Sequence, residues 1–154
     1  MSAQLQQLYQ QIILDHAKAR HGAGLVEAPA GPKAGESHQL NPTCGDEITL
    51  RAVLDGSAAG VPSVEGISWE GQGCSISMAS ASVLTDLAAG LSRDEVMDLV
   101  ENFREVMRSR GTVEADEEVL GDAAAFSGVS RYPARVKCAM LAWVALEEAL
   151  LAAN

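Results

Sequence analysis

Three cysteines, spread over most of the chain, constrain this sequence more than any other feature. They are Cys44, Cys74 and Cys138. Cys44 and Cys74 each lie beside a glycine, where the backbone can turn sharply and come close to a small ligand. An odd number of thiols argues against a complete disulfide framework, so the cysteines are expected to be ligands, nucleophiles or plain core residues. They can act together only if the fold brings them to one place.

Asp46 adds a fourth donor beside the first cysteine. Its spacing from Cys44 is compatible with two ligands supplied by one tight turn, and zinc accepts both cysteine sulfur and aspartate oxygen. The long gaps to Cys74 and Cys138 are unlike a zinc finger, which uses local Cys-x-x-Cys pairs. Free cysteine is also among the most buried residue types. Spacing alone therefore leaves two interpretations open, one shared metal site or three unrelated core residues.

Length and charge limit the class of protein. A chain of 154 residues is expected to form one domain, residues 1–154, with a core that needs no disulfide. The net charge of −10 and the six aromatic residues (two each of Trp, Tyr and Phe) disfavour nucleic-acid binding, because phosphates require a basic surface. No apolar run reaches the roughly 18 residues that a membrane span needs. The first residues do not show the basic region followed by an apolar segment that is typical of a signal peptide. We expect a cytoplasmic protein with no nucleic-acid or membrane partner.

The first half of the chain predicts a helix followed by a small sheet. Residues 3–18 have helical spacing, and His16 lies on their apolar side, which favours a hydrogen-bonded core histidine over a ligand. Residues 22–35, rich in Gly, Ala and Pro, are expected to be a loop. Polar and apolar residues alternate in 47–54 and 64–71, and a short strand at 38–41 would complete an antiparallel sheet of about three strands.

The second half is predicted to be helical. An apolar stripe after Cys74 places this cysteine at a helix N-terminus, with Ser75 or Ser77 as the cap. The pair Ser92 and Glu95 forms a capping box that begins the next helix.

The region before the third cysteine combines an acidic cluster with flexible glycines. Residues 112–131 are therefore predicted to be an irregular, exposed insertion, and the cluster is interpreted as a solvated face rather than a docking site. Pro133 then begins the last helix, which carries Cys138.

Three motifs surround the cysteines: Cys-Gly-Asp at 44–46, Gly-Cys-Ser-Ile-Ser at 73–77 and Lys-Cys-Ala-Met-Leu-Ala-Trp at 137–143. Together they resemble the U-type iron–sulfur cluster assembly proteins, the IscU/NifU-N family, and Tyr9-x-x-Ile-Ile-Leu-Asp-His16 is similar to that family's first helix. The resemblance extends over nearly the whole chain. It implies an α+β fold, in which a three-stranded antiparallel sheet packs against about five helices and the cysteines cluster at one end.

Within this family the sequence resembles the SufU type. IscU-type scaffolds carry a histidine immediately before the third cysteine, where this chain has Lys137, and the insertion at about 112–131 is also similar to SufU-type proteins. The resemblance implies a zinc-binding transferase that accepts sulfur from a SufS-type cysteine desulfurase, with a SufBCD-type scaffold complex downstream. It further implies Cys44 as the sulfur acceptor and Arg135 as a residue that steers or releases it. The implied zinc ligands are Cys44, Asp46, Cys74 and Cys138.

Two other functions remain open from the sequence. A scaffold on which a [2Fe–2S] cluster is assembled could use the same donors, since iron–sulfur sites mostly use thiolates. Lys137 in the place of histidine argues against that function. A purely structural zinc site is disfavoured by Asp46, a hard ligand in an otherwise soft set. The leading prediction is a zinc-dependent sulfurtransferase that relays persulfide sulfur into iron–sulfur cluster assembly.

Overall fold

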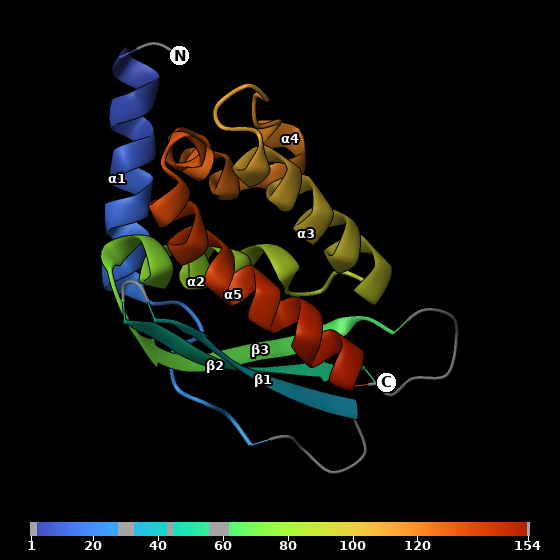
Figure 1. Ribbon diagram of the computed structural model, residues 1–154. Helices are drawn as coiled ribbons and strands as arrows, with labels where there is room; N and C mark the ends of the chain where they lie inside the picture. Colours follow the sequence, from blue (N-terminus) through green and yellow to red (C-terminus); the bar gives the residue numbers. More distant parts are fainter. Residues whose placement is uncertain (1–2, 28–32, 43–44, 56–61, 154) are drawn as a thin grey trace.

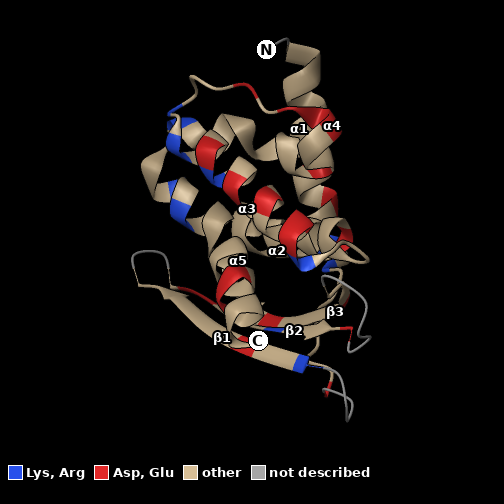
Figure 2. Ribbon diagram, turned by 90° about the vertical axis from the view of Figure 1, so that its right-hand side faces the viewer, with Lys and Arg blue, Asp and Glu red and all other residues tan. Residues whose placement is uncertain are grey.

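The protein has one sheet with its helices packed on one face (Figures 1 and 2). The computed structural model describes residues 3–27, 33–42, 45–55 and 62–153. The strands are β1 (Lys33–Asn41), β2 (Asp46–Leu54) and β3 (Val64–Gln72), antiparallel in the order β1-β2-β3. The helices are α1 (Ala3–Ala19), α2 (Ser75–Ala88), α3 (Arg93–Arg108), α4 (Glu117–Leu120) and α5 (Pro133–Ala152), with a 3₁₀ helix η1 (Gly121–Arg131) before α5. The predicted α+β class is confirmed.

The alternation of β2 determines which face of the sheet is covered. Ile48, Leu50, Ala52 and Leu54 are at most 1% exposed, while the residues between them are half-buried. Because successive side chains on a strand point to opposite faces, this pattern turns one face of the sheet toward the helices. The helix α5 lies across that face, against β1 and β2 (Figure 1).

The strand β1 is longer than predicted, because residues 33–35 belong to it rather than to the preceding loop. Gly35 pairs with Ala52 in the register of β1 and β2. A Cβ atom on Gly35 would lie 1.8 Å from the carbonyl oxygen of Ala149 in α5, so only glycine allows the helix backbone to approach the strand this closely. The glycine that predicted a loop is therefore a packing position.

Two helix starts were predicted from caps, with different outcomes. The capping box of α3 is confirmed: Ser92 Oγ accepts from the Glu95 N–H at 3.1 Å, and Glu95 Oε1 accepts from the Ser92 N–H at 3.0 Å. The cap predicted for α2 is wrong, since the N-cap is Cys74 and its side chain makes no capping bond. Neither Ser75 nor Ser77 is the cap, because the helix begins immediately after the cysteine.

The segment 112–131 is only partly exposed. Its acidic first part lies at the surface as predicted, but the prediction of exposure is wrong for η1, in which residues 123–127 are buried. Phe126 meets Phe103 of α3 edge to face, with ring centroids 6.1 Å apart, and Phe103 stacks on Trp143 of α5 at 4.0 Å. The three alanines at 123–125 are small enough to let η1 approach α1 and α5 closely. Nothing in the structure tests whether this segment is an insertion.

Charge is distributed over the helical layer. Acidic positions recur along α3 (Figure 2), consistent with the net charge of −10. None of the helices in the described part of the chain is both long enough and apolar enough to cross a bilayer.

Candidate metal centre

Three of the four predicted metal ligands meet near the start of α2. Asp46 begins β2, Cys74 is the N-cap of α2, and Cys138 lies in the second turn of α5. One ligand atom from each residue lies within 4.8 Å of the others. Cys44, the fourth predicted ligand, lies outside the described residues, so its place in the site remains a prediction.

Asp46 is the centre of this arrangement and is fully buried. Its Oδ1 accepts from the Cys74 backbone N–H at 2.9 Å, and its Oδ2 accepts from Ser77 Oγ at 2.6 Å. The Cys74 thiol sulfur lies 3.8 Å from the same Oδ2. Gly73 makes room for the carboxylate, since a Cβ atom there would lie 2.4 Å from Asp46 Oδ1. The Gly-Cys dipeptide thus allows the start of α2 to approach the carboxylate.

Hydrogen bonds compensate the buried carboxyl group of Asp46. Burial raises its pKa, but hydrogen bonds from Cys138, from Ser77 and from the backbone and thiol of Cys74 together hold the pKa below the ordinary aspartate value. Among the described residues, no Lys, Arg or His forms an ion pair with this carboxylate. One carboxylate and two thiols therefore meet at one place, and these are donors that zinc accepts.

The two described cysteines differ in exposure. Cys74 is exposed and is the N-cap of α2. Cys138 is 3% exposed, and its sulfur lies 3.9 Å from Asn41 Nδ2 and 3.8 Å from the Ala134 carbonyl oxygen. The centre therefore has one buried thiol, that of Cys138, and one exposed thiol, that of Cys74.

Sequence reasoning missed two residues of the centre, Ser77 and Asn41. Ser77 Oγ lies 2.6 Å from Asp46 Oδ2 and 3.3 Å from the Cys138 carbonyl oxygen, so it joins β2, α2 and α5. The three-residue spacing from Cys74 at a helix start was the available signal, because side chains at this spacing share a helix face. Asn41 is the last residue of the predicted strand 38–41, and its pairing with Asp46, one residue before the predicted strand 47–54, was not predicted.

Arg135 and Lys137 both lie on the exposed side of α5. The Arg135 guanidinium lies 5.4 Å from the ring centroid of Tyr132, a cation–π contact one turn before Cys138. The role predicted for Arg135 is therefore not tested by its contacts. Lys137 is exposed, which confirms that it faces solvent.

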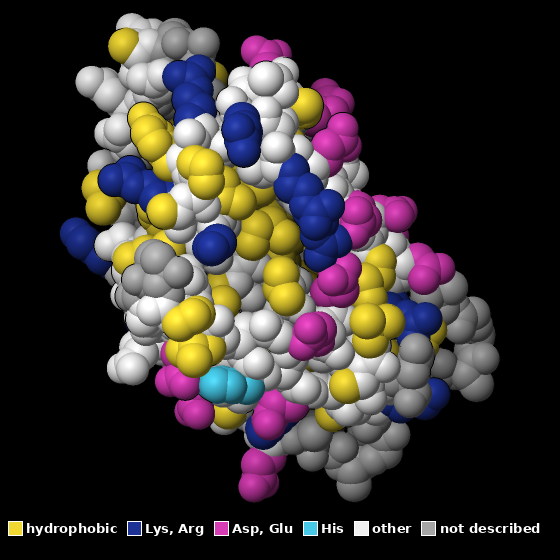
Figure 3. Space-filling view, viewed as in Figure 1, with side chains coloured by type: hydrophobic (Ala, Val, Ile, Leu, Met, Phe, Trp, Pro, Cys, Tyr) yellow, Lys and Arg dark blue, Asp and Glu magenta, His cyan; other side chains and the backbone are white. Residues whose placement is uncertain are grey.

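A groove of about 790 Å³ lies between α1 and the segment 111–135. Its lining includes Ile76 of α2, two residues after Cys74, and Arg135 of α5, three residues before Cys138. Leu14 and Tyr132, which also line it, are 50% and 55% exposed. Figure 3 shows apolar side chains interleaved with basic ones over the helical layer, and acidic side chains gathered toward one side. The surface of the helical layer thus carries both apolar and basic groups.

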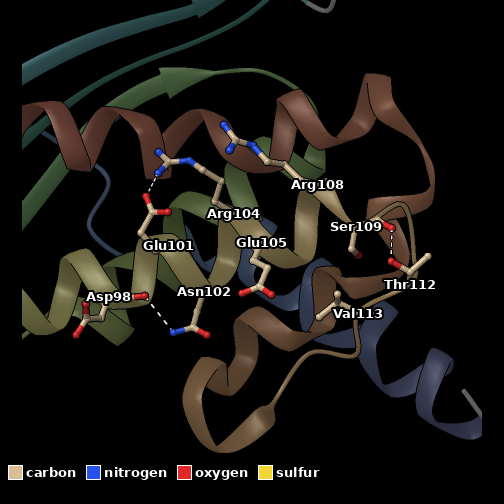
Figure 4. A pocket seen from close by; sticks show the side chains of 9 residues that line it. All are labelled: Asp98, Glu101, Asn102, Arg104, Glu105, Arg108, Ser109, Thr112 and Val113. Atoms are coloured by element: carbon tan, nitrogen blue, oxygen red, sulfur yellow. Dashed lines mark hydrogen bonds and ion pairs between the residues drawn. The ribbon is translucent and has the colours of Figure 1, made fainter.

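A second hollow, of about 690 Å³, lies over α3 and the loop that follows it. Its lining is almost entirely polar, and Arg104 there binds Glu101 (Figure 4). Arg104 also binds Glu147 of α5. It contains no cysteine or histidine. This hollow offers no ligand set comparable to the one around Asp46.

Comparison with known proteins shows the family of the chain. Residues 8–150 match the family model described as the NifU-like N-terminal domain. The chain is 40% identical over 148 residues to the zinc-dependent sulfurtransferase SufU of Bacillus subtilis (strain 168), covering 96% of this chain and 92% of that protein. It is 37% identical over 149 residues to the iron–sulfur cluster assembly scaffold protein IscU of Streptococcus pyogenes serotype M1, covering 96% and 86%.

The fold has close counterparts among solved structures. One is a candidate iron–sulfur cluster assembly scaffold protein for the SUF system from Fervidobacterium islandicum AW-1. It superposes with a TM-score of 0.78 at 33% sequence identity, covering 94% of this chain and 97% of that one.

Proposed function

The chain belongs to the NifU-like N-terminal domain family, and from this premise we propose that it is a zinc-dependent sulfurtransferase. It accepts persulfide sulfur from a SufS-type cysteine desulfurase and relays it toward iron–sulfur cluster assembly. The observation that carries the proposal is the buried Asp46 carboxylate, which has one oxygen within 4.8 Å of two thiol sulfurs. The relative named as a zinc-dependent sulfurtransferase, at 40% identity, supports it.

The donor set fits zinc. Asp46, Cys74 and Cys138 supply one oxygen and two sulfur ligands, and Cys44, two residues before Asp46 in the sequence, would supply the third sulfur. Four such ligands complete the tetrahedral coordination that zinc prefers. When bound, zinc keeps its thiol ligands deprotonated and protects them from oxidation. A carboxylate in place of a fourth thiolate leaves the set less soft than a Cys₄ structural site.

Cys44 performs the transfer step. Its thiolate attacks the outer sulfur of the desulfurase cysteine persulfide, forming a new S–S bond on Cys44. The original S–S bond breaks, and the desulfurase cysteine leaves as a thiolate. The proton stays on the transferred sulfur, so the step moves one sulfur atom without net oxidation or reduction.

The surroundings of the site support this reaction. Arg135, exposed on α5 one turn before Cys138, attracts the attacking Cys44 thiolate and stabilises the thiolate that leaves the desulfurase cysteine. The desulfurase covers the groove between α1 and the segment 111–135, where Leu14 and Tyr132 present exposed apolar surface. The persulfide on Cys44 then passes to a scaffold complex of the SufBCD type.

Intact-protein mass spectrometry tests the proposal directly. The chain is incubated with a SufS-type desulfurase and free cysteine, and we expect one additional sulfur atom on Cys44 that a thiol reductant removes. Cys44→Ala should fold normally by circular dichroism and gain no sulfur, while the matched surface control Lys137→Ala should gain it normally. Full sulfur loading of Cys44→Ala, or full stimulation of the desulfurase by it, would overturn the assignment.

A second candidate function is a scaffold for [2Fe–2S] assembly. It is favoured by the two relatives named iron–sulfur cluster assembly scaffold protein IscU, at 37% and 34% identity. Three thiols and a carboxylate can ligate such a cluster. Anaerobic reconstitution with iron and sulfide separates the two functions, because a scaffold would become coloured and hold stoichiometric acid-labile sulfide.

A further inference from the structure

A second cluster of metal-binding side chains lies far from the cysteines. His16 in the last turn of α1, His21 in the turn after α1 and Asp86 of α2 each offer one ligand atom, and these atoms lie within 4.8 Å of one another. We propose that these three side chains form a second binding site, for a divalent transition metal such as zinc. Asp86 follows Cys74 by twelve residues, which corresponds to about 18 Å along a helix axis, so the two sites are separate. The inference does not depend on the proposed function.

His16 is held in a defined orientation. It is 8% exposed, its Nδ1 lies 2.8 Å from Ser82 Oγ, and its Nε2 lies 3.2 Å from Asp122 Oδ2. Ser82 Oγ already accepts from the His21 N–H at 3.0 Å, which leaves the hydroxyl proton for His16 Nδ1. The Nε2–H of His16 then donates to Asp122, so a metal would bind at Nδ1 and would replace the hydrogen bond from Ser82 there. A carboxylate that binds the far nitrogen of an imidazole is the arrangement that orients metal-binding histidines.

The imidazole of His21 is the second nitrogen donor of the cluster. Its Nδ1 lies 2.7 Å from Asp86 Oδ2, and its ring stands at 78° to the His16 ring with centroids 5.2 Å apart. The backbone of His21 is fixed at both ends, since its carbonyl oxygen accepts from Trp69 Nε1 at 2.8 Å and its N–H donates to Ser82. The His21 and Asp86 side chains are 48% and 51% exposed, so an ion and a completing water molecule can reach them.

The donor chemistry selects the class of metal. Two imidazole nitrogens and one carboxylate oxygen form a ligand set that zinc uses when a fourth position is left to water. Magnesium and calcium prefer all-oxygen surroundings, and imidazole favours the transition metals. The two carboxylates in contact with the imidazoles, those of Asp86 and Asp122, would balance the charge of a divalent cation.

The histidine content makes a sharp test possible, because the chain has only three histidines. Protein labelled with ¹⁵N and carrying one equivalent of zinc is titrated with a second equivalent while the imidazole nitrogens are observed by NMR. His38 is a matched control: its Nε2 lies 2.8 Å from Glu47 Oε2, and these two side chains are 54% and 43% exposed. We expect the ring nitrogens of His16 and His21 to shift and those of His38 to stay. If no ring responds, or if His38 responds equally, the cluster is only a hydrogen-bond network and the proposal is wrong.

A pair of variants gives an independent measurement. His21→Asn and His38→Asn each remove an exposed imidazole from a His–carboxylate pair, and His16 stays intact because its burial makes a folding defect possible. After equilibration with zinc and removal of the free ion, wild type and His38→Asn should each retain one zinc ion per chain more than His21→Asn, whether or not the cysteine site also holds zinc. Equal zinc content in His21→Asn and His38→Asn would overturn the assignment. Because neither variant alters a cysteine, this result is independent of sulfur transfer to Cys44.

Discussion

Replacing Gly73 by alanine tests whether the metal centre depends on the close approach of α2 to Asp46. The new Cβ would lie 2.4 Å from Asp46 Oδ1 and 2.9 Å from its Cγ, below the 3.0 Å that real Cβ contacts respect. Asp46 is fully buried and cannot swing into solvent. The carboxylate must therefore move away from the Cys74 N–H, to which it is bonded at 2.9 Å.

The expected magnitude follows from two contributions. Overpacking by one methyl group costs about 1–3 kcal/mol, and loss of a hydrogen bond to a charged group costs about 1.5–3 kcal/mol. Together they lower the free energy of unfolding by about 4 kcal/mol. The displaced carboxylate should also weaken zinc binding, because Asp46 is one of the proposed ligands.

The assay compares urea unfolding of the metal-free Gly73→Ala with that of Gly66→Ala. Gly66 lies in β3, and a Cβ atom there would meet nothing within 4 Å, so this control should change stability by less than about 1 kcal/mol. Zinc content after dialysis should fall for Gly73→Ala and remain at the wild-type level for the control. Equal stability and equal zinc content in the two variants would refute the reasoning.

Two further predictions concern helix ends and helix contacts. Hydrogen bonds from the Ser92 backbone and side chain lower the pKa of Glu95, so its stabilisation is present above the ordinary value of 4.5 and is lost as pH falls through the lowered pKa. The melting temperature of Glu95→Gln should accordingly lie below that of wild type at neutral pH and converge with it in acid, whereas the exposed control Glu105→Gln should show no such pH-dependent difference. Burial, and then the hydrogen bond to Glu117, raise the pKa of Tyr9 to about 12, so this stabilisation is present below the ordinary value of 10.0 and is lost as pH rises through about 12. Urea unfolding of Tyr9→Phe should show a loss of about 1.5 kcal/mol at neutral pH that shrinks in strong alkali, and a constant difference would contradict it.

Most helices and strands could be predicted from patterns of neighbouring residues, because such patterns depend on local structure rather than on distant packing. The alternation of β2 and the capping box at Ser92 each depend on neighbouring residues, and both are confirmed. The errors arose where distant packing decides. Gly35 belongs to a strand because the α5 backbone packs against it, and η1 is buried because Phe126 meets Phe103 of α3.

The sequence predicted part of the candidate site. Cys74 and Cys138 could be selected because the chain has only three cysteines, and Asp46 because it lies two residues after Cys44; the structure brings these three residues together. Ser77 could have been found only from its three-residue spacing from Cys74. Asn41 could not be selected, since asparagine is an ordinary residue until the register of β1 and β2 pairs it with Asp46.

X-ray absorption spectroscopy of protein purified without oxygen tests the central claim most directly, because it identifies both the metal and its ligands. The account predicts zinc, with three sulfur ligands at about 2.3 Å and one oxygen ligand, and with one sulfur fewer in Cys44→Ala. Iron in place of zinc, or an unchanged sulfur count in Cys44→Ala, would contradict it.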